Sequence, residues 1–251
     1  MLENSMENSP PANYDLQVTE DGSFTLYSHA FKEACHSYQG AQTETLTYYV
    51  KGCQILERVS FFTPLNILEI GFGTGLGYLL TMQELTEQAH HVEFISLEID
   101  EDLVQWSNQK FFGNNLQKKE TSFFSYYEFK NLKVILGDAR STLPLIPNIF
   151  SNFNPHAIYH DAFSPVVCPN LWSVEWFKQL KDISHPQCLF STYSISSRVR
   201  KGLIEAGWIL QEGQKFARKK GSTIAVLEGE HDSSILEHLV RSPVLPIKDQ
   251  I

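Results

Sequence analysis

Three acidic residues of this chain each follow an apolar run that predicts a short buried strand. Glu98 closes the run that begins at residue 91, Asp138 follows residues 131–136, and Asp161 follows residues 155–159. Because the carboxyl ends of neighbouring parallel strands meet at one edge of a sheet, we expect these carboxylates to gather there. Carboxylates in that position accept hydrogen bonds from the hydroxyl and amino groups of a ligand. One such residue alone is equally well explained as a turn former or helix cap.

A glycine-rich turn precedes the three carboxylates. Residues 65–70 predict a buried strand, glycine then occupies every second position from Gly71 to Gly77, and helical spacing resumes at residues 78–85. Glycine allows a sharp turn and a close approach of backbone to ligand. The spacing does not match a dinucleotide fingerprint, which would place glycine where this chain has Leu76, and the Gly-Lys-Ser/Thr ending of a P-loop is absent. The alternative is a tight strand–helix turn without a ligand.

The glycine turn resembles motif I of the class I S-adenosylmethionine (SAM) methyltransferases. The resemblance implies SAM as the cofactor. Glu98 would then accept hydrogen bonds from the ribose hydroxyls and Asp138 from the adenine amino group, while Asp161 would lie beside the transferable methyl group. The expected cofactor-binding residues are Glu69, Gly71, Gly73, Thr74, Gly75, Glu98, Asp138 and Asp161.

Strands and helices alternate after the glycine turn, which predicts a mainly parallel sheet covered by helices. The expected strands are 91–99, 131–136, 155–159 and 188–193, and the expected helices are 102–111, 170–180, 196–206 and, in the tail, 233–240. Residues 207–210 and 223–227 predict an antiparallel hairpin at the sheet edge. Upstream, Asp-Gly at 21–22 predicts a small hairpin, and residues 43–58 predict a helix. The shape of the insertion at residues 113–130 is left open.

The expected fold class is therefore α/β, a Rossmann-like class I SAM methyltransferase fold with a small N-terminal hairpin and helix extension. We divide the chain into a disordered N-terminus (1–13), an N-terminal extension (14–60), a SAM-dependent methyltransferase domain (61–230) and a C-terminal tail (231–251).

Composition narrows the cellular setting. The chain has 251 residues, a net charge of −9 and four scattered cysteines without C-x-x-C spacing. This predicts free thiols in a reducing compartment. No signal peptide or membrane-spanning run is evident, so we expect a cytoplasmic protein. His90 and His91 have no carboxylate or cysteine at ligand spacing, so no metal is expected. No obligate protein partner is evident.

Basic residues gather in one stretch of this acidic chain. Their concentration is compatible with phosphate binding, although a run of charges is more often a solvated face. The residues that we expect to contact a polyanion are Arg198, Arg200, Lys215, Lys219 and Lys220.

The segment after Asp161 contains two prolines and ends at Trp172. Such a rigid aromatic loop is either a structural loop with Trp172 in the core or a wall on which a planar base stacks. In the second interpretation, Phe163 and Trp172 contact the substrate, and Tyr193, at the end of the next strand, also lines the pocket.

The combined motifs resemble the MnmD methyltransferases, which correspond to the methyltransferase domain of bifunctional MnmC. The match runs from about residue 15 to 228 and includes Gly71–Leu76, Asp161–Pro165, Pro169–Trp172, Thr192–Ser194 and Arg198–Arg200. It departs at Gly77, where the family usually has Asn, and around Phe216–Lys220.

The resemblance implies methylation of the primary amine of 5-aminomethyl-(2-thio)uridine at the tRNA wobble position. SAM is the implied cofactor, without FAD, and the tRNA anticodon stem-loop is the implied partner. Asp161 would orient the amine, with Tyr193 as a second catalytic candidate, and the basic stretch would hold anticodon-stem phosphates.

Three alternatives stay open at this point. An aminopropyltransferase of the spermidine-synthase type also attacks a sulfonium with an amine, although the basic stretch fits a polyanion better than a polyamine. Another SAM-dependent amine N-methyltransferase is the second. A non-catalytic SAM- or RNA-binding module is the third, and the set of Glu98, Asp138 and Asp161 argues against it.

Overall fold

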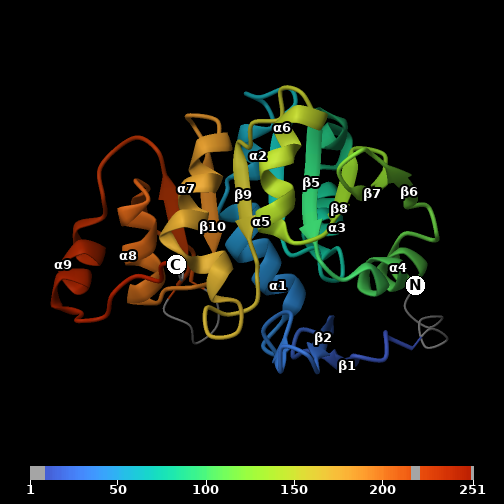
Figure 1. Ribbon diagram of the computed structural model, residues 1–251, viewed down its shortest axis with the longest axis horizontal. Coiled ribbons are helices and arrows are strands. Elements are labelled where there is room, and N and C mark those ends of the chain that lie inside the picture. Colours follow the sequence, from blue (N-terminus) through green and yellow to red (C-terminus); the bar gives the residue numbers. More distant parts are fainter. Residues whose placement is uncertain (1–8, 216–220, 250–251) are drawn as a thin grey trace.

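The computed structural model describes residues 9–215 and 221–249. A nine-stranded sheet in the order β11-β12-β10-β9-β4-β5-β8-β7-β6 forms its centre, with helices on both faces (Figure 1). The parallel strands are β4 (Leu65–Ile70), β5 (Val92–Glu98), β8 (Leu132–Leu136), β9 (Ala157–His160) and β10 (Leu189–Thr192). Each of these strands begins and ends within two residues of its predicted bounds. The predicted fold class is confirmed.

The strand order reverses at β4. β5 and β8 lie on one side of it, and β9 and β10 lie on the other. In open sheets of this kind the ligand binds outside the carboxyl ends of the strands at such a reversal. The turn after β4 is therefore placed at the expected ligand crevice.

Each strand of the sheet centre is apolar on both faces, because helices cover both. In β4, Leu65 and Ile67 belong to one core cluster, whereas Leu68 and Ile70 belong to the other. The first cluster packs with α3 (Leu76–Leu85) and α4 (Glu101–Phe111). The second packs with α7 (Val174–Ile183) and α8 (Ser197–Glu205). This explains why all six residues of β4 are buried, rather than every second one.

Antiparallel hairpins extend the sheet at both edges. β11 (Ile209–Glu212) and β12 (Thr223–Val226) pair with each other as the predicted hairpin, and β12 joins it to β10. At the other edge β6 (Gln117–Glu120) and β7 (Ser125–Phe129) continue from β8. The insertion whose shape the sequence left open is thus an edge hairpin.

The N-terminal extension forms a separate three-stranded sheet of β1 (Tyr14–Val18), β2 (Phe24–Ser28) and β3 (Glu33–Ala34). This sheet lies below the central sheet, beside α1 (Figure 1). The helix predicted at 43–58 is broken into α1 (Ala41–Thr45), a π-helical segment η1 (Leu46–Lys51) and α2 (Ile55–Arg58). Gln54 takes a left-handed conformation at the break, with φ 52°.

The remaining elements are short. They are the 3-10 turns η2 (Thr86–His91), η3 (Leu143–Leu145) and η4 (Pro169–Trp172), the helices α5 (Ala139–Thr142) and α6 (Ile146–Ile149), and the tail helix α9 (Ser233–Arg241). The helix predicted from residue 170 begins instead at Val174, because Ser173 caps it by accepting a hydrogen bond from the Trp176 amide. The segment predicted to be disordered comprises residues 1–13, and residues 1–8 of it lie outside the described residues.

Among the described residues, no helix is long and apolar enough to cross a membrane. Within the same ranges, no three His, Cys, Asp or Glu side chains come together in a way that could hold a metal ion.

Candidate active site

A cavity of about 280 Å³ lies at the carboxyl ends of the parallel strands. This volume is close to the lower end of the range for small-molecule sites, about 300–1,000 Å³. Its walls come from the glycine turn, the ends of β5, β8 and β9, the 161–171 loop and the N-terminal extension. Of the sequence-predicted residues it brings together Glu69, Gly71, Gly73, Glu98, Asp138, Asp161 and Phe163.

Gly71 and Gly73 of the glycine turn have a positive φ, and Gly71 also makes a close approach. Gly71 has a φ of 94°, and a Cβ there would lie 2.9 Å from the carbonyl oxygen of Asp161. Gly73 has a φ of 54°, and a Cβ there would meet nothing within 4 Å. Gly73 also lines the cavity. The turn therefore packs against the 161 loop at Gly71 and presents a bare backbone at Gly73.

The buried carboxyl of Glu69 explains why residue 77 has no side chain. A Cβ at Gly77 would lie 1.9 Å from Oε1 of Glu69. The carboxylate is held in place from the other side because the Ser96 hydroxyl donates a 2.6 Å hydrogen bond to Oε2. Burial raises the pKa of Glu69 well above its ordinary value. The absence of a side chain at Gly77 thus gives this buried carboxyl its room.

Glu98 fixes the glycine turn from the end of β5. Its Oε2 accepts from the Gly73 amide at 3.0 Å, and Oε1 accepts from the amides of Ile99 and Asp100. Burial raises its pKa, and the backbone donors oppose this shift. Glu98 therefore both shapes the turn and stands at the cavity wall where a ribose is expected.

Asp138 caps the short helix α5. Its Oδ1 accepts from the Arg140 amide at 2.8 Å and from the Ser141 amide at 3.3 Å. The side chain is exposed and borders the cavity. Both interpretations of an acidic strand end, helix cap and ligand contact, are thus compatible with its position.

Asp161 stands directly after β9 with each carboxylate oxygen facing a different neighbour. The Tyr49 hydroxyl donates a 2.6 Å hydrogen bond to Oδ1. Nε2 of His36 lies 3.9 Å from Oδ2. Burial lowers the pKa of His36, so its imidazole is neutral beside the carboxylate. Burial and the charge of Asp161 raise the pKa of Tyr49, so it remains a hydroxyl donor.

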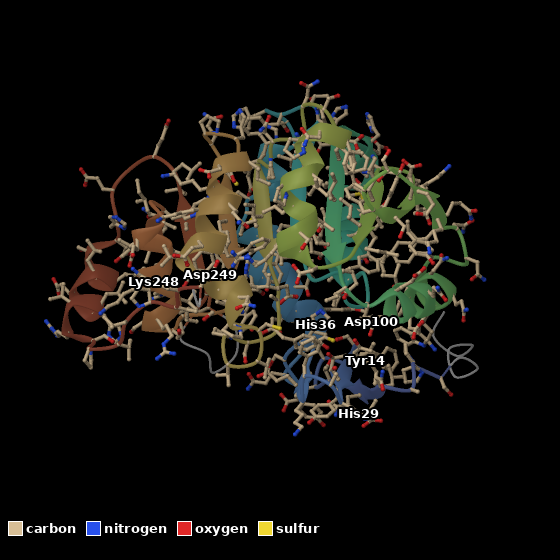
Figure 2. The ribbon with its side chains drawn as sticks, viewed as in Figure 1. Tyr14, His29, His36, Asp100, Lys248 and Asp249 are labelled. Atoms are coloured by element: carbon tan, nitrogen blue, oxygen red, sulfur yellow. The ribbon has the colours of Figure 1, made fainter. Side chains whose placement is uncertain are left out.

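The N-terminal extension supplies cavity residues that no sequence pattern indicated. Tyr14, Phe31, Cys35, His36, Thr45 and Tyr49 all line the cavity. In Figure 2, Tyr14, His36 and Asp100 lie close together below the central sheet. The Tyr14 hydroxyl donates to Asp100 at 2.8 Å, which ties β1 to the N-cap of α4. No spacing rule marks these residues, since they reach the site only through long-range packing.

The loop after Asp161 is anchored to the same extension. The ring of Phe163 stacks on Phe31, with centroids 4.4 Å apart. Next to it, the amide and hydroxyl of Ser164 donate to the carboxylate of Glu33. Phe163 and Phe31 thus form one aromatic wall of the cavity.

Two aromatic residues expected at the pocket support it instead. Trp172 is 0% exposed, and its Nε1 donates to the Phe163 carbonyl at 2.7 Å. Its ring cannot stack on a base, because it lies in the core beneath the loop. The Tyr193 hydroxyl donates to the Ala162 carbonyl at 3.0 Å, which brings Tyr193 under the same loop. Both residues hold Asp161 and Phe163 in place from below.

Thr74 and Gly75 of the glycine turn lie beside the cavity rather than on its wall, and so does His160 of β9. Thr74 is buried, and its carbonyl accepts from the Ser107 hydroxyl at 2.8 Å. A Cβ at Gly75 would touch the rings of Phe72 and Phe112. His160, the last residue of β9, is buried, and its Nε2 accepts from Trp176 Nε1 at 3.0 Å.

The residues of the basic stretch differ in their exposure to solvent. Arg198 and Lys215 are exposed. Arg200 is buried and donates to Thr223 Oγ1 and to the Ser222 carbonyl, so it braces β12 and cannot face a polyanion. Lys219 and Lys220 lie outside the described residues.

The groups that line the site fit SAM in their chemistry. The bare backbone at Gly73 gives a flat approach, and carboxylates from β5 and β8 stand along the wall beyond it. Asp161 stands on the opposite side of the strand-order reversal. These residues would hold the ribose, the adenine and the methyl-bearing end in turn.

Comparison with known proteins agrees with this assignment. A family model described as S-adenosyl-L-methionine-dependent methyltransferase matches residues 101–228, just over half of the chain. The crystal structure of MnmC2 from Aquifex aeolicus has 28% identity and a TM-score of 0.77, with 98% of this chain and 81% of that chain covered. The expected resemblance to the MnmC methyltransferases is confirmed.

Curated relatives are longer than this chain. The bifunctional protein MnmC of Burkholderia mallei, named for tRNA 5-methylaminomethyl-2-thiouridine biosynthesis, is 27% identical over 248 residues. An uncharacterised protein of Methanocaldococcus jannaschii is 24% identical over 222 residues. The matches cover 86% and 84% of this chain, which spans 35% of the first protein and 58% of the second. With the family model and the site geometry together, the chain belongs to the S-adenosyl-L-methionine-dependent methyltransferases.

Proposed function

We propose that this protein methylates the primary amine of 5-aminomethyl-(2-thio)uridine at the wobble position of tRNA, giving the 5-methylaminomethyl product. The observation that carries the proposal is the Asp161 carboxylate at the cavity, with Oδ1 held by Tyr49. The names of the MnmC relative and of the MnmC2 structure support the choice of tRNA as substrate.

The reaction needs an amine with a free lone pair in line with the methyl group. When bound, the cofactor supplies a methyl group on a positively charged sulfur. An alkylammonium has a pKa of roughly 10, taking lysine as a model, so the amine must lose a proton before it attacks. The protein therefore has to position the amine and let that proton leave, rather than provide a strong base.

Asp161 is suited to orienting the amine. Asp161 lines the cavity, its Oδ1 accepts from Tyr49, and its Oδ2 lies on the side of His36. An amine N–H donated to Oδ2 would fix the direction of the nitrogen lone pair. The neutral imidazole of His36 stands 3.9 Å from the same oxygen, close enough to help pass the released proton outward.

The aromatic wall is suited to the base. The Phe31 and Phe163 rings stack at 4.4 Å, and both residues line the cavity. Aromatic rings of this kind take up unstacked bases of RNA. Phe163 follows Asp161 by two residues, so a base held there would bring its 5-substituent toward the carboxylate.

The exposed Arg198 and Lys215 are proposed to hold anticodon-stem phosphates, together with Lys219 and Lys220 beyond the described residues. Arg200 is removed from this set by its burial. Action on tRNA in the cytoplasm is part of the same proposal.

The deciding experiment incubates the protein with methyl-labelled SAM and tRNA that carries 5-aminomethyl-(2-thio)uridine at the wobble position. We expect label in the wobble uridine and none in a polyamine control. Transfer of an aminopropyl group from decarboxylated SAM to the polyamine, followed by mass spectrometry in a parallel incubation, or methylation of small amines but not tRNA, would replace the proposal with one of the other amine-transfer reactions. SAM binding without any transfer would indicate a binding module.

A further inference from the structure

The segment at residues 243–249 runs across the start of α7. The Val174 amide donates to the Ile247 carbonyl at 2.9 Å, and Ser173 and Ile247 form a parallel β-bridge. The Asp249 amide donates to the carboxylate of Glu175 at 2.9 Å. The backbone of this segment is therefore fixed on the N-terminal turn of the helix, and Lys248 and Asp249 lie side by side there (Figure 2).

The carboxylate of Asp249 pairs with the guanidinium of Arg140, which belongs to α5. Nη1 of Arg140 lies 2.8 Å from Oδ1 of Asp249, and Nη2 donates to Oδ2. Such a two-pronged pair fixes the plane of both groups. Burial acts to raise the pKa of Asp249, but the hydrogen bonds from Arg140 and Ser173 outweigh it and hold the pKa below its ordinary value.

The same guanidinium also binds the loop after Asp161. Nη1 of Arg140 donates to the Asn170 carbonyl at 2.9 Å and to Ser173 Oγ at 3.0 Å. Arg140 and Asn170 both line the cavity, and Arg140 follows Asp138 by two residues. One side chain thus joins the β8 end of the cavity to the loop that carries Asp161.

We propose that Asp249 is a positioning residue of the cofactor site, which acts by holding Arg140 across these two walls. The segment lies beyond the residues matched by the family model, which end at 228. The inference rests on the cofactor site and is independent of which molecule accepts the methyl group. Without Asp249 the Arg140 guanidinium loses two of its contacts, and the spacing between residues 138–140 and 169–171 is less firmly set.

The test compares the full chain with D249N, which keeps the shape of the side chain and removes its charge. Calorimetric titration with SAM, in the absence of tRNA, should show a Kd about three- to tenfold higher, as expected for losing a partly exposed charged pair. Where turnover is measurable, KM for SAM should rise by the same factor while kcat at saturating SAM stays unchanged.

K248A is the matched control. Lys248 is the neighbouring residue, but its Nζ pairs with Glu205 of α8 at 2.7 Å and not with the cavity wall. K248A should bind SAM as the unaltered protein does. Amide hydrogen exchange of the free protein should become faster at residues 139–141 and 170–172 in D249N only, a readout that needs no activity.

Unchanged SAM affinity in D249N, or an equal loss in K248A, would overturn the proposal. Exchange that quickens throughout the chain would do so too, because it would show general destabilisation. Since the titration uses no tRNA, failure of the proposed tRNA reaction would leave this result standing on its own.

Discussion

The hydroxyl of Tyr49 donates a 2.6 Å hydrogen bond to Oδ1 of Asp161, joining two residues 112 positions apart in the chain. Tyr49 is 2% exposed and belongs to the π-helical segment η1, which precedes the central sheet. The N-terminal extension therefore sets the orientation of the carboxylate that we place beside the transferable methyl group.

Replacing Tyr49 by Phe should lower kcat for methyl transfer by about 10- to 100-fold, because a hydrogen bond to a charged group contributes about 1.5–3 kcal/mol. SAM affinity should be retained, since the ring stays in place. Steady-state kinetics together with calorimetric SAM titration separate the two effects.

Tyr78→Phe is the control for that variant. Tyr78 is also a buried tyrosine, and its hydroxyl donates to Asn131 at 2.9 Å, outside the cavity. The Tyr78→Phe variant should lose about 1 kcal/mol of stability, the contribution of one hydrogen bond, and should keep a normal kcat. If both variants lost kcat equally, the special role of the Tyr49–Asp161 pair would be refuted.

Asp161→Asn should bind SAM and lose methyl transfer by about 10²- to 10⁴-fold, the usual cost of removing a positioned acid or base. The amide keeps the size of the side chain but cannot accept from both Tyr49 and an amine in the same way. Single-turnover measurements with labelled SAM give the rate directly. Near-normal turnover would remove Asp161 from the mechanism.

Gly77→Ala and Gly73→Ala should fail in different ways. At Gly77 the added Cβ displaces the Glu69 carboxyl, and we expect a stability loss of about 1–3 kcal/mol. At Gly73 the Cβ has free space, so the left-handed backbone should cost about 1–2 kcal/mol and the principal effect should be weaker SAM binding. Urea unfolding and SAM titration of both variants measure the difference.

A double variant checks the cause assigned to Gly77. Glu69→Ala removes the carboxyl that a Cβ at position 77 would strike. Combined with Gly77→Ala, the total stability loss should be smaller than the sum of the two single losses, because neighbouring effects do not add. Strict additivity would contradict the contact between them.

The stability of the protein should fall as the pH drops below about 6.5. Burial lowers the pKa of His156 to about 4 and of His160 to about 3. A base whose folded pKa is depressed contributes stability that is complete above its unfolded pKa of about 6.5 and is lost as the pH falls toward the folded value. Each should contribute a loss of at most about 2 kcal/mol between pH 6.5 and pH 5.

Substitutions separate the contribution of the histidines from that of the buried carboxyls. The pKa of Glu69 is raised, so Glu69 changes the stability in the opposite direction as the pH falls. His156→Gln should lose less stability between pH 7.5 and pH 5 than the unaltered protein in urea unfolding. His90→Gln, at an exposed histidine, should leave this pH dependence unchanged. An unaltered pH dependence in His156→Gln would refute the assignment.

Substituting Arg198 and Lys215 by Ala should weaken tRNA binding and flatten its salt dependence, because each phosphate contact adds about 0.7–0.9 to the slope. SAM affinity should be unaffected. Replacing Lys219 and Lys220 should act in the same direction. Lys118 and Lys119 of β6, at the opposite sheet edge, serve as controls, and an equal effect there would argue against a localised tRNA surface.

The sequence by itself determined the central strands of the sheet and the order in which the glycine turn and the carboxylates follow them. Apolar runs bounded by Gly71, Asp138 and Asp161 predict β4, β8 and β9, because strand length and burial are encoded over a few consecutive residues. The glycine spacing favoured SAM over a dinucleotide for the same local reason. Glu98 and Asp161 then follow at strand ends, where topology alone brings them to one edge.

The tertiary structure decided which side chains complete the site. Trp172 and Phe163 lie in the same loop, yet one is buried beneath it and the other faces the cavity. Arg198 and Arg200 are two positions apart, and only the first is exposed. Tyr49 and His36 reach Asp161 because the extension folds over the carboxyl ends of the strands. Such contacts depend on packing between segments far apart in the chain, which no local pattern records.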